Sequence, residues 1–373
     1  MMLADDEAVI GEWLSRDGAF VCYREPGARV CRGLRAAPDA LRPFEDISLL
    51  DGKSGFVFAP FRVGREHPLW LLPGGDGMSV ALSRASCSGE VEAPAPVPFV
   101  GERQAQPTEA YSRAFRAFSD ALRGGRFRKL VLSREQVGPS PVDFSWAKAF
   151  CAACRRYVHS YVYLFHAPQT GYWLGATPEI LLKTEGAEGR TMALAGTQFL
   201  RDGVLREPWS EKNIREQAYV TDYIMDCLRG QGLSPAADGP QTATAGELAH
   251  LRTDICFALP STGMLGSLLR ALHPTPAVCG LPKDEAFRFI GAHEGYDRSY
   301  YAGFLGRLSP GGHTALYVNL RCMACSGEAG AFRLYAGGGL LPESVLEEEW
   351  TETERKLQTM KYVIEKGKSH VYR

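Results

Sequence analysis

Short apolar runs bounded by glycine and proline alternate with amphipathic stretches along the chain. Runs of four to eight apolar or alternating residues predict β-strands, and apolar positions that recur every three or four residues predict helices. We expect strands within 54–63, 67–75, 127–137, 160–177, 179–186, 189–197, 250–259 and 313–339, the last stretch forming a hairpin. We expect helices at about 108–124, 143–157, 209–230 and from 342 onwards, with two short helices between the Gly/Pro-rich segment at 273–282 and the strand that begins at 313.

The order of these elements favours an α+β fold. Strands that cluster as hairpins, with helices between the groups, indicate largely antiparallel sheets and not a doubly wound parallel sheet. The polar stretch 232–247 lacks a clear apolar pattern and is predicted to be a loop. The proline-rich stretch 91–107 is the candidate linker. We therefore expect a single domain over 1–373, with a strand-rich part at 1–105 and a core part at 106–370.

Composition excludes several classes of protein. The 373 residues are 45% hydrophobic and 23% charged, with a formal charge of -1, so no general attraction to nucleic acid or an anionic membrane is expected. No run of 18 apolar residues predicts a membrane-spanning helix. The N-terminal stretch is acidic and amphipathic, unlike a signal peptide, so we expect a cytoplasmic protein.

Ten scattered cysteines suit a reducing compartment better than a disulfide framework. Two pairs have the CxxC spacing, Cys151/Cys154 and Cys322/Cys325. Together they could form a four-thiolate zinc site, but the first pair lies on a predicted helix without the usual turn glycines, and the second ends a predicted strand. We favour small thiols in the core.

Charged residues line the edge of the apolar stripe on the last helix. The stripe, at 100° per residue, consists of Leu346, Trp350, Thr353, Leu357 and Met360. Glu349, Glu352 and Lys356 lie along its edge, whereas Glu347 and Glu354 point to the opposite side and are expected in solvent. A half-buried carboxylate needs a partner. That partner is either Lys356, in a salt bridge with Glu349 or Glu352, or a bound cation.

The helix at 209–230 carries a further acid in an apolar position. Its apolar face consists of Tyr219, Val220, Tyr223, Ile224 and Cys227. One turn earlier, the same face continues onto Glu216. Glu216, Glu349 and Glu352 are thus three acids on two helices where water is scarce. This arrangement favours a hard cation such as Mg²⁺, which takes oxygen ligands.

Other charged residues lie within predicted strands. Lys129 is either a snorkelling edge residue or, if enclosed, a candidate general base. Glu179 directly follows a proline at a strand start, and if desolvated it stays protonated and can donate its proton. Arg321, in an apolar strand, needs an anionic partner. The glycine-bearing segments 194–197 and 335–339 either present backbone N–H groups to carboxylates or form tight turns.

Ten of these segments, taken in order between about 108 and 365, resemble the chorismate-utilising enzymes and, among them, the isochorismate synthases. They are "FRKLVLSR", "GATPEILL", "ALAGT", "EKNIREQAYV", "HLRT", "LHPTPAVCGLP", "YDRSYYAGFLG", "VNLRC", "LYAGGG" and "EEEWTETERKL". The first ~100 residues contribute little to the resemblance.

The resemblance implies large antiparallel sheets flanked by helices around a deep central active site in the core part, which binds chorismate and requires Mg²⁺. It implies that Lys129 is the base that activates water and that Glu179 is the acid that protonates the departing ring hydroxyl. Glu216 and Glu352 resemble the metal carboxylates, with Glu349 close by through water. The implied substrate-binding residues are Gly196, Thr197, His250, Ala277, Tyr301, Arg321, Gly338 and Lys356.

Differences within the family favour an isochorismate synthase. Anthranilate synthases resemble the chain but carry glutamine where Lys129 stands, and aminodeoxychorismate synthases carry a lysine where Ala195 stands. Salicylate synthases share Lys129 and Glu179 but tend to have threonine near Ala277. Water as the nucleophile implies that no glutamine amidotransferase partner is required. The alternatives are a salicylate synthase and a non-catalytic chorismate-binding or regulatory subunit.

Two features of the resemblance remain open. Relatives usually continue "AGT" or "AGS" with arginine, whereas this chain continues with Gln198, Phe199 and Leu200. The product of the reaction feeds either menaquinone or siderophore synthesis, and menaquinone, as the more widespread use, is the expectation.

Overall fold

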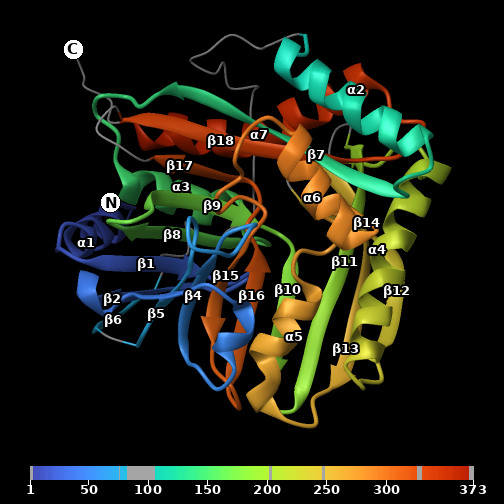
Figure 1. Ribbon diagram of the computed structural model, residues 1–373. Coiled ribbons are helices and arrows are strands. Elements are labelled where there is room, and N and C mark those ends of the chain that lie inside the picture. The colour runs from blue at the N-terminus through green and yellow to red at the C-terminus, as the bar shows by residue number, and fades with distance from the viewer. Residues whose placement is uncertain are drawn as a thin grey trace.

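Two large antiparallel β-sheets pack face to face, with helices around them (Figure 1). The computed structural model describes residues 3–74, 76–81, 106–200, 204–245, 248–325 and 330–368. The predicted α+β fold with large antiparallel sheets is confirmed. The candidate linker at 91–107 and the expected boundary near 105 lie almost entirely outside the described residues.

The first sheet, as far as it is described, has nine strands in the order β14-β7-β18-β17-β9-β8-β1-β2-β6. The strands are β14 (Gly280–Leu281), β7 (Lys129–Pro139), β18 (Ala331–Leu340), β17 (Cys322–Cys325), β9 (Gly171–Thr177), β8 (Tyr161–Ala167), β1 (Ala19–Arg24), β2 (Val30–Ala36) and β6 (Asp76–Ala81).

The second sheet also has nine described strands, in the order β12-β13-β11-β10-β16-β15-β4-β5-β3. The strands are β12 (Ala236–Ala245), β13 (Leu248–Ala258), β11 (Glu188–Phe199), β10 (Ile180–Glu185), β16 (His313–Val318), β15 (Phe304–Leu308), β4 (Gly55–Ala59), β5 (Leu69–Leu72) and β3 (Arg42–Phe44). The strands before residue 82 therefore complete one end of both sheets.

Aromatic side chains join the two sheets. Phe58 of β4 stacks on Phe165 of β8 with 4.2 Å between ring centroids, and Tyr161 of β8 stacks on Tyr317 of β16 at 4.2 Å. All four side chains are buried. Aromatic pairs of this kind bury a large apolar area and add a specific geometry. The apolar runs of the sequence thus form a core between the sheets.

The described helices cover the outer faces and ends of the sheets (Figure 1). They are α1 (Leu3–Leu14), α2 (Glu109–Arg123), α3 (Trp146–Arg156), α4 (Glu211–Gly230), α5 (Leu265–Leu272), α6 (Lys283–His293) and α7 (Leu346–Gly367), with 3-10 turns η1 (Pro38–Ala40), η2 (Ile47–Leu50) and η4 (Thr262–Met264). Side chains of α1, α3 and α7 share a second core with the first sheet. Helix α4 packs on β11 and β13 of the second sheet.

Local sequence signals set the starts of several helices. Thr108, Ser145 and Ser210 precede α2, α3 and α4, and each side chain accepts a hydrogen bond from a backbone N–H in the first turn. This capping satisfies a donor that has no partner within the helix. None of the described helices combines the length and apolar character needed to cross a bilayer.

The prediction of a loop at 232–247 is wrong, because β12 occupies most of this stretch. Among the described strands, β12 is at the edge of the second sheet and has β13 as its one partner. Nearly all of its described side chains are exposed or half-buried. An edge strand needs a backbone partner but no buried face, so the polar sequence gave no strand signal.

The predicted hairpin at 313–339 is also wrong in its first arm. β16 pairs with β10 and β15 in the second sheet, whereas β17 pairs with β18 and β9 in the first sheet. The chain passes from one sheet to the other at residues 319–321, where Arg321 has a φ of 47°. An apolar run does not reveal which sheet each half joins.

The prediction that Glu354 points into solvent is also wrong. Its carboxylate forms an ion pair with Arg134 of β7 and another with Lys361, whose Nζ lies 3.2 Å away. Arg134 also lies over the Trp350 ring, with its guanidinium carbon 3.7 Å from the centroid. Burial of the charge is possible because two cations compensate it.

The CxxC pairs lie in different surroundings. Cys151 and Cys154 on α3 are buried beside Cys22 and Cys31 in the second core, and the Sγ atoms of Cys31 and Cys154 are 3.9 Å apart. Cys322 is buried in the first core and Cys325 is half-buried. In the part of the chain that the structure describes, no group of three or more cysteine, histidine or acidic side chains is arranged to hold a metal ion.

Candidate active site

A cavity bordered by residues of β7, β11, β13, β18, α4 and α7 collects most of the predicted site residues. Eleven of the thirteen line it, namely Glu179, Gly196, Thr197, Glu216, His250, Ala277, Tyr301, Arg321, Gly338, Glu352 and Lys356. The other two lie directly behind this lining. Lys129 Nζ is 3.1 Å from Glu216 Oε1, and Glu349 Oε2 is 3.0 Å from the position that a Cβ would take at Gly338.

Three glycines of β18 make room for the acids. A Cβ at Gly339 would lie 2.0 Å from Glu216 Oε1, and one at Gly337 would lie 2.8 Å from the Ser133 Cβ. These residues pair with β7 in a regular ladder, so they lie inside a strand and do not form a tight turn. The glycines are required because any side chain would fill the space between β18 and its neighbours.

Gly196 has a different role in β11. Its φ is 71°, and the register with β13 shifts between Ala195 and Thr197, as in a β-bulge. A Cβ there would also lie 3.1 Å from the backbone oxygen of Asn213 in α4. The bulge directs the carbonyl of Gly196 toward His250, whose Nδ1 lies 3.1 Å from the oxygen.

Lys129 is fully buried at the start of β7, so it is not a snorkelling edge residue. It forms an ion pair with Glu216 across 3.1 Å, yet its Nζ has no hydrogen-bond partner of suitable geometry. A buried ammonium without hydrogen bonds is poorly solvated. The amine is therefore available to a further acceptor in the cavity.

Glu179 is buried where β9 leads into β10. Burial raises the pKa of its carboxyl from 4.5 to about 8, although the charges of Lys129 and Lys356 act in the opposite direction. Removal from water disfavours the charged form, and here this effect exceeds the attraction to the cations. At pH 7 the carboxyl is mostly protonated and can donate a proton.

Each of the three acids expected to bind a metal is paired with a lysine. Glu216 pairs with Lys129 at 3.1 Å, and Glu352 pairs with Lys356 at 2.7 Å. Lys356 also donates to the carbonyl oxygen of Gly337 at 2.7 Å. The salt-bridge explanation for the edge of α7 thus holds for Glu352 and Lys356.

The partners of Glu349 come from outside helix α7. Lys212 of α4 forms an ion pair with its Oε1, and Ser344 Oγ donates to the same oxygen at 2.8 Å. Its Oε2 is buried and has no hydrogen-bond partner. Burial, followed by repulsion from Glu352, raises the pKa of Glu349 to about 7, against the attraction of Lys212.

The donor set has the chemistry that Mg²⁺ requires. Glu216, Glu349 and Glu352 offer carboxylate oxygens from two helices, and the buried Oε2 of Glu349 has no partner. Repulsion between Glu349 and Glu352 is a further cost that a cation relieves. Since the lysine pairs hold the three carboxylates individually, the described residues do not form an assembled metal cluster.

His250 and Arg321 form a fixed pair in the lining of the cavity. Arg321 Nη2 donates to His250 Nε2 at 2.7 Å, so the histidine proton is on Nδ1, where it is donated to the Gly196 carbonyl. Burial, with the charges of Arg321 and Lys356, lowers the pKa of His250 well below its ordinary value. The imidazole is therefore neutral, and its Nε2 orients the guanidinium of Arg321.

Sequence reasoning missed Lys212, Ser133, Glu294 and Arg298. Glu294 and Arg298 are buried and ion-paired, and Arg298 lines the cavity. Their spacing of four residues was a possible signal, but a pair of charges four residues apart is far more often on a solvated helix face. Only their burial distinguishes them.

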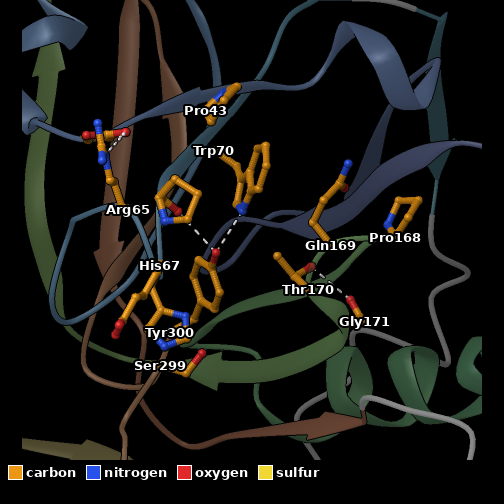
Figure 2. Close-up of a pocket in the computed structure, with 13 residues that line it drawn as sticks. Pro43, Arg65, His67, Trp70, Pro168, Gln169, Thr170, Gly171, Ser299 and Tyr300 are labelled. Atoms are coloured by element: carbon orange, nitrogen blue, oxygen red, sulfur yellow. Dashed lines mark hydrogen bonds and ion pairs between the residues drawn. The ribbon is translucent and has the colours of Figure 1, made fainter.

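A second hollow lies next to the same backbone segment (Figure 2). Ser299 and Tyr300 line it, whereas Tyr301 lines the first cavity. Trp70 Nε1 donates to Tyr300 Oη at 2.7 Å, and Tyr300 donates to the Pro68 carbonyl at 3.1 Å. It contains none of the predicted site residues, so the candidate active site is the first cavity.

Comparisons with known proteins agree with this geometry. The family model described as "Chorismate binding enzyme" matches residues 81–365. A salicylate biosynthesis isochorismate synthase of Pseudomonas aeruginosa is 30% identical over 369 residues, which cover 90% of this chain and 74% of that protein. The isochorismate synthase EntC of Escherichia coli is 35% identical over 208 residues, or 53% of each chain.

Solved structures show the same fold. DhbC of Bacillus anthracis superposes with a TM-score of 0.75 at 22% identity, covering 95% of this chain and 98% of that one. MenF, the menaquinone-specific isochorismate synthase of E. coli, gives 0.73 at 20% identity, covering 98% of this chain and 100% of that one. The match of the family model over most of the chain, together with these relatives, shows that the protein belongs to the chorismate-binding enzyme family.

Proposed function

We propose that the protein is an isochorismate synthase, which interconverts chorismate and isochorismate by exchanging one ring hydroxyl for another. One observation carries the proposal. The buried amine of Lys129 lies close enough to Glu179 for its charge to affect the pKa of that carboxyl, which burial keeps protonated. Water addition with loss of a hydroxyl needs one base and one acid. The names of the relatives EntC and MenF support the same activity.

Lys129 and Glu179 have complementary roles in the proposed reaction. In its neutral form, Lys129 accepts a proton from water as the water oxygen bonds to the ring carbon beside the carboxylate-bearing one. Glu179 donates its proton to the departing hydroxyl, which leaves as water while the ring double bonds shift. One water enters and one leaves, so the reaction requires no oxidant.

Two cations in the lining of the cavity suit a substrate with two carboxylates. Arg321, held by His250, offers a guanidinium, and Lys356 offers an ammonium that already contacts Gly337. Arginine is well suited to a carboxylate because its planar donors match the two oxygens. We propose that these groups, with Tyr301 and the backbone of Gly196, Thr197 and Gly338, bind chorismate.

Mg²⁺ is the proposed cofactor, held by Glu216 and Glu352, with Glu349 nearby. When bound, the cation supplies positive charge that allows these carboxylates and a doubly negative substrate to coexist. The buried, unpartnered Oε2 of Glu349 supports this proposal. The lysine partners of the three acids keep them compensated in its absence.

The supply of isochorismate to menaquinone synthesis remains a prediction. The relatives include both MenF and a salicylate biosynthesis enzyme. Their names therefore do not decide whether the product is used for menaquinone or for another end product. Because water is the proposed nucleophile, we expect turnover without ammonia and without an amidotransferase partner.

The proposal is tested by incubating the purified protein with chorismate and Mg²⁺ and separating the products by chromatography. Isochorismate alone is the expected product, in an amount independent of added ammonium. Salicylate with pyruvate would instead identify a salicylate synthase. If a folded preparation that binds chorismate forms neither product, the protein is a binding subunit.

A further inference from the structure

Beyond its short partner β14, the edge of β7 is hydrogen-bonded by side chains in place of a strand. β14 pairs with β7 at Lys129 and Leu130 and extends no further. The Val131 N–H still donates to the Cys279 carbonyl at 2.7 Å, and the next edge groups of β7 are the Val131 carbonyl and the Ser133 N–H. Arg298 Nη2 donates to the carbonyl at 2.8 Å, and the Ser133 N–H is donated to Glu294 Oε1 at 2.7 Å.

Glu294 and Arg298 are locked to each other in one geometry. Arg298 Nε lies 2.6 Å from Glu294 Oε2, and Arg298 Nη2 lies 2.7 Å from Glu294 Oε1. Arg298 Nη1 donates to the Val278 carbonyl at 2.7 Å, and Ser133 Oγ donates to Glu294 Oε1 at 2.7 Å. Both side chains are at least 98% buried. A bidentate pair whose arginine also donates to two backbone carbonyls has little freedom to shift.

The pair joins two walls of the active site. Val131 lines the cavity and lies two residues after Lys129, on the same face of β7. Val278 follows Ala277, and both line the cavity on the adjacent segment. Arg298 bonds to the backbone of both segments, so it fixes the strand of the amine relative to the wall of the substrate pocket.

We infer that Glu294 and Arg298 are positioning residues, which act through the backbone of β7 to set the place of Lys129 relative to bound substrate. This inference rests on the proposed function. A role in stability alone explains the pair less well, because apolar side chains of similar size often stabilise a core as much as a buried ion pair does. The pair differs from an apolar replacement because it holds the Val131 carbonyl and the Ser133 N–H, and with them the backbone of β7, in one place.

The test compares two Glu→Asp substitutions, one at the end of α6 and one in α7, whose carboxylates both bind residues of β7. Glu294→Asp shortens the carboxylate of the positioning pair. Glu354→Asp shortens the half-buried carboxylate of α7 that is ion-paired with Arg134 of β7. Both variants retain their charges, so neither leaves a buried cation without a partner. Arg298→Lys is the second test variant, which keeps the charge but loses the planar fork.

We expect Glu294→Asp to lower kcat by about tenfold to a hundredfold, because a displacement of about 1 Å in reacting groups has effects of this size. The KM and the chorismate dissociation constant should stay within about threefold of the wild-type values. Glu354→Asp should lower Tm to a similar extent while kcat changes by less than about twofold. Amide exchange at Ser133 should accelerate in Glu294→Asp and not in Glu354→Asp.

Equal losses of kcat in the two variants, or an unchanged kcat in Glu294→Asp, would overturn the inference. If Glu294→Asp does not fold, the same comparison is made with Arg298→Lys, and an unchanged kcat there is equally decisive. Amide exchange at Ser133 does not depend on turnover. If the wild-type protein forms no isochorismate, the proposed function fails, while the exchange data still report whether the pair holds β7.

Discussion

His250 Nε2 lies 2.7 Å from Arg321 Nη2, and this contact fixes the imidazole as a neutral acceptor. Arg321 is buried at the point where the chain leaves one sheet for the other, and burial lowers its pKa to about 10. The guanidinium remains charged at neutral pH, while His250 and the carbonyl of Gly196 hold its direction.

Replacement of His250 by alanine should weaken the binding of chorismate. A hydrogen bond to a charged group contributes about 1.5–3 kcal/mol, so we expect kcat/KM to fall by roughly tenfold to a hundredfold, mainly through KM. Steady-state kinetics and calorimetric titration measure the change. His273→Ala is the control, because His273 is equally buried but bonds to the Phe61 carbonyl outside the site. Equal effects on KM in the two variants would refute the role of His250.

Lys129→Ala should abolish turnover while chorismate still binds. Loss of a general base typically lowers the rate by about 10²–10⁴-fold. Product chromatography and binding titration measure the two effects separately. Lys183→Ala is the matched control, since Lys183 is a partly buried lysine of β10, in the other sheet, and lies over the Tyr317 ring. Retained turnover in Lys129→Ala would show that another group is the base.

The pKa of Glu179, raised to about 8, predicts both an activity profile and a stability profile. The acid form is lost above pH 8, so kcat should fall as the pH rises beyond that value. The folded state also binds this proton more tightly than the unfolded state. The contribution of Glu179 to stability is therefore fully present below about pH 4.5 and declines until about pH 8.

Glu179→Gln removes this titration and should be inactive. Its Tm relative to the wild-type protein should rise between pH 5 and pH 8, as measured by thermal unfolding across that range. A constant difference in Tm would contradict the raised pKa of Glu179, whatever the activity shows.

Glu352→Gln should raise the concentration of Mg²⁺ needed for half-maximal activity. One charged oxygen ligand is lost, so we expect a shift of about tenfold or more. Glu347→Gln, an exposed position on the same helix, is the control and should give the wild-type titration. The metal assignment is wrong if both variants titrate alike.

Gly339→Ala should inactivate the protein, because the added Cβ would lie 2.0 Å from Glu216 Oε1 and 2.9 Å from Lys129 Cε. Either the strand or both charged side chains must move. Gly138→Ala is the control on the paired strand β7, where nothing lies within 4 Å of the added atom. Near-normal activity of Gly339→Ala would mean that the Lys129–Glu216 pair is not needed in this position.

Much of the fold was predictable because it depends on local patterns. The strands at 160–177 and the helix starts at Thr108 and Ser210 follow from apolar runs and capping side chains. Glu216 was identified as a misplaced acid because it continues an apolar helix face, and the structure buries it. The glycines of β18 were noticed, although their place inside a strand was not.

What the sequence by itself determined is the set of amphipathic elements, the acids and bases that stand on apolar faces, and the motifs shared with a family. The tertiary structure alone decided which partner each of these residues meets. β12 exists because β13 offers it a backbone edge, and Glu354 is withdrawn from solvent because Arg134 reaches it from another element. Glu294 and Arg298 bond to β7 because β14 is short. Periodicity reports which side of an element is apolar, but pairing between distant segments depends on long-range packing, which no local pattern encodes.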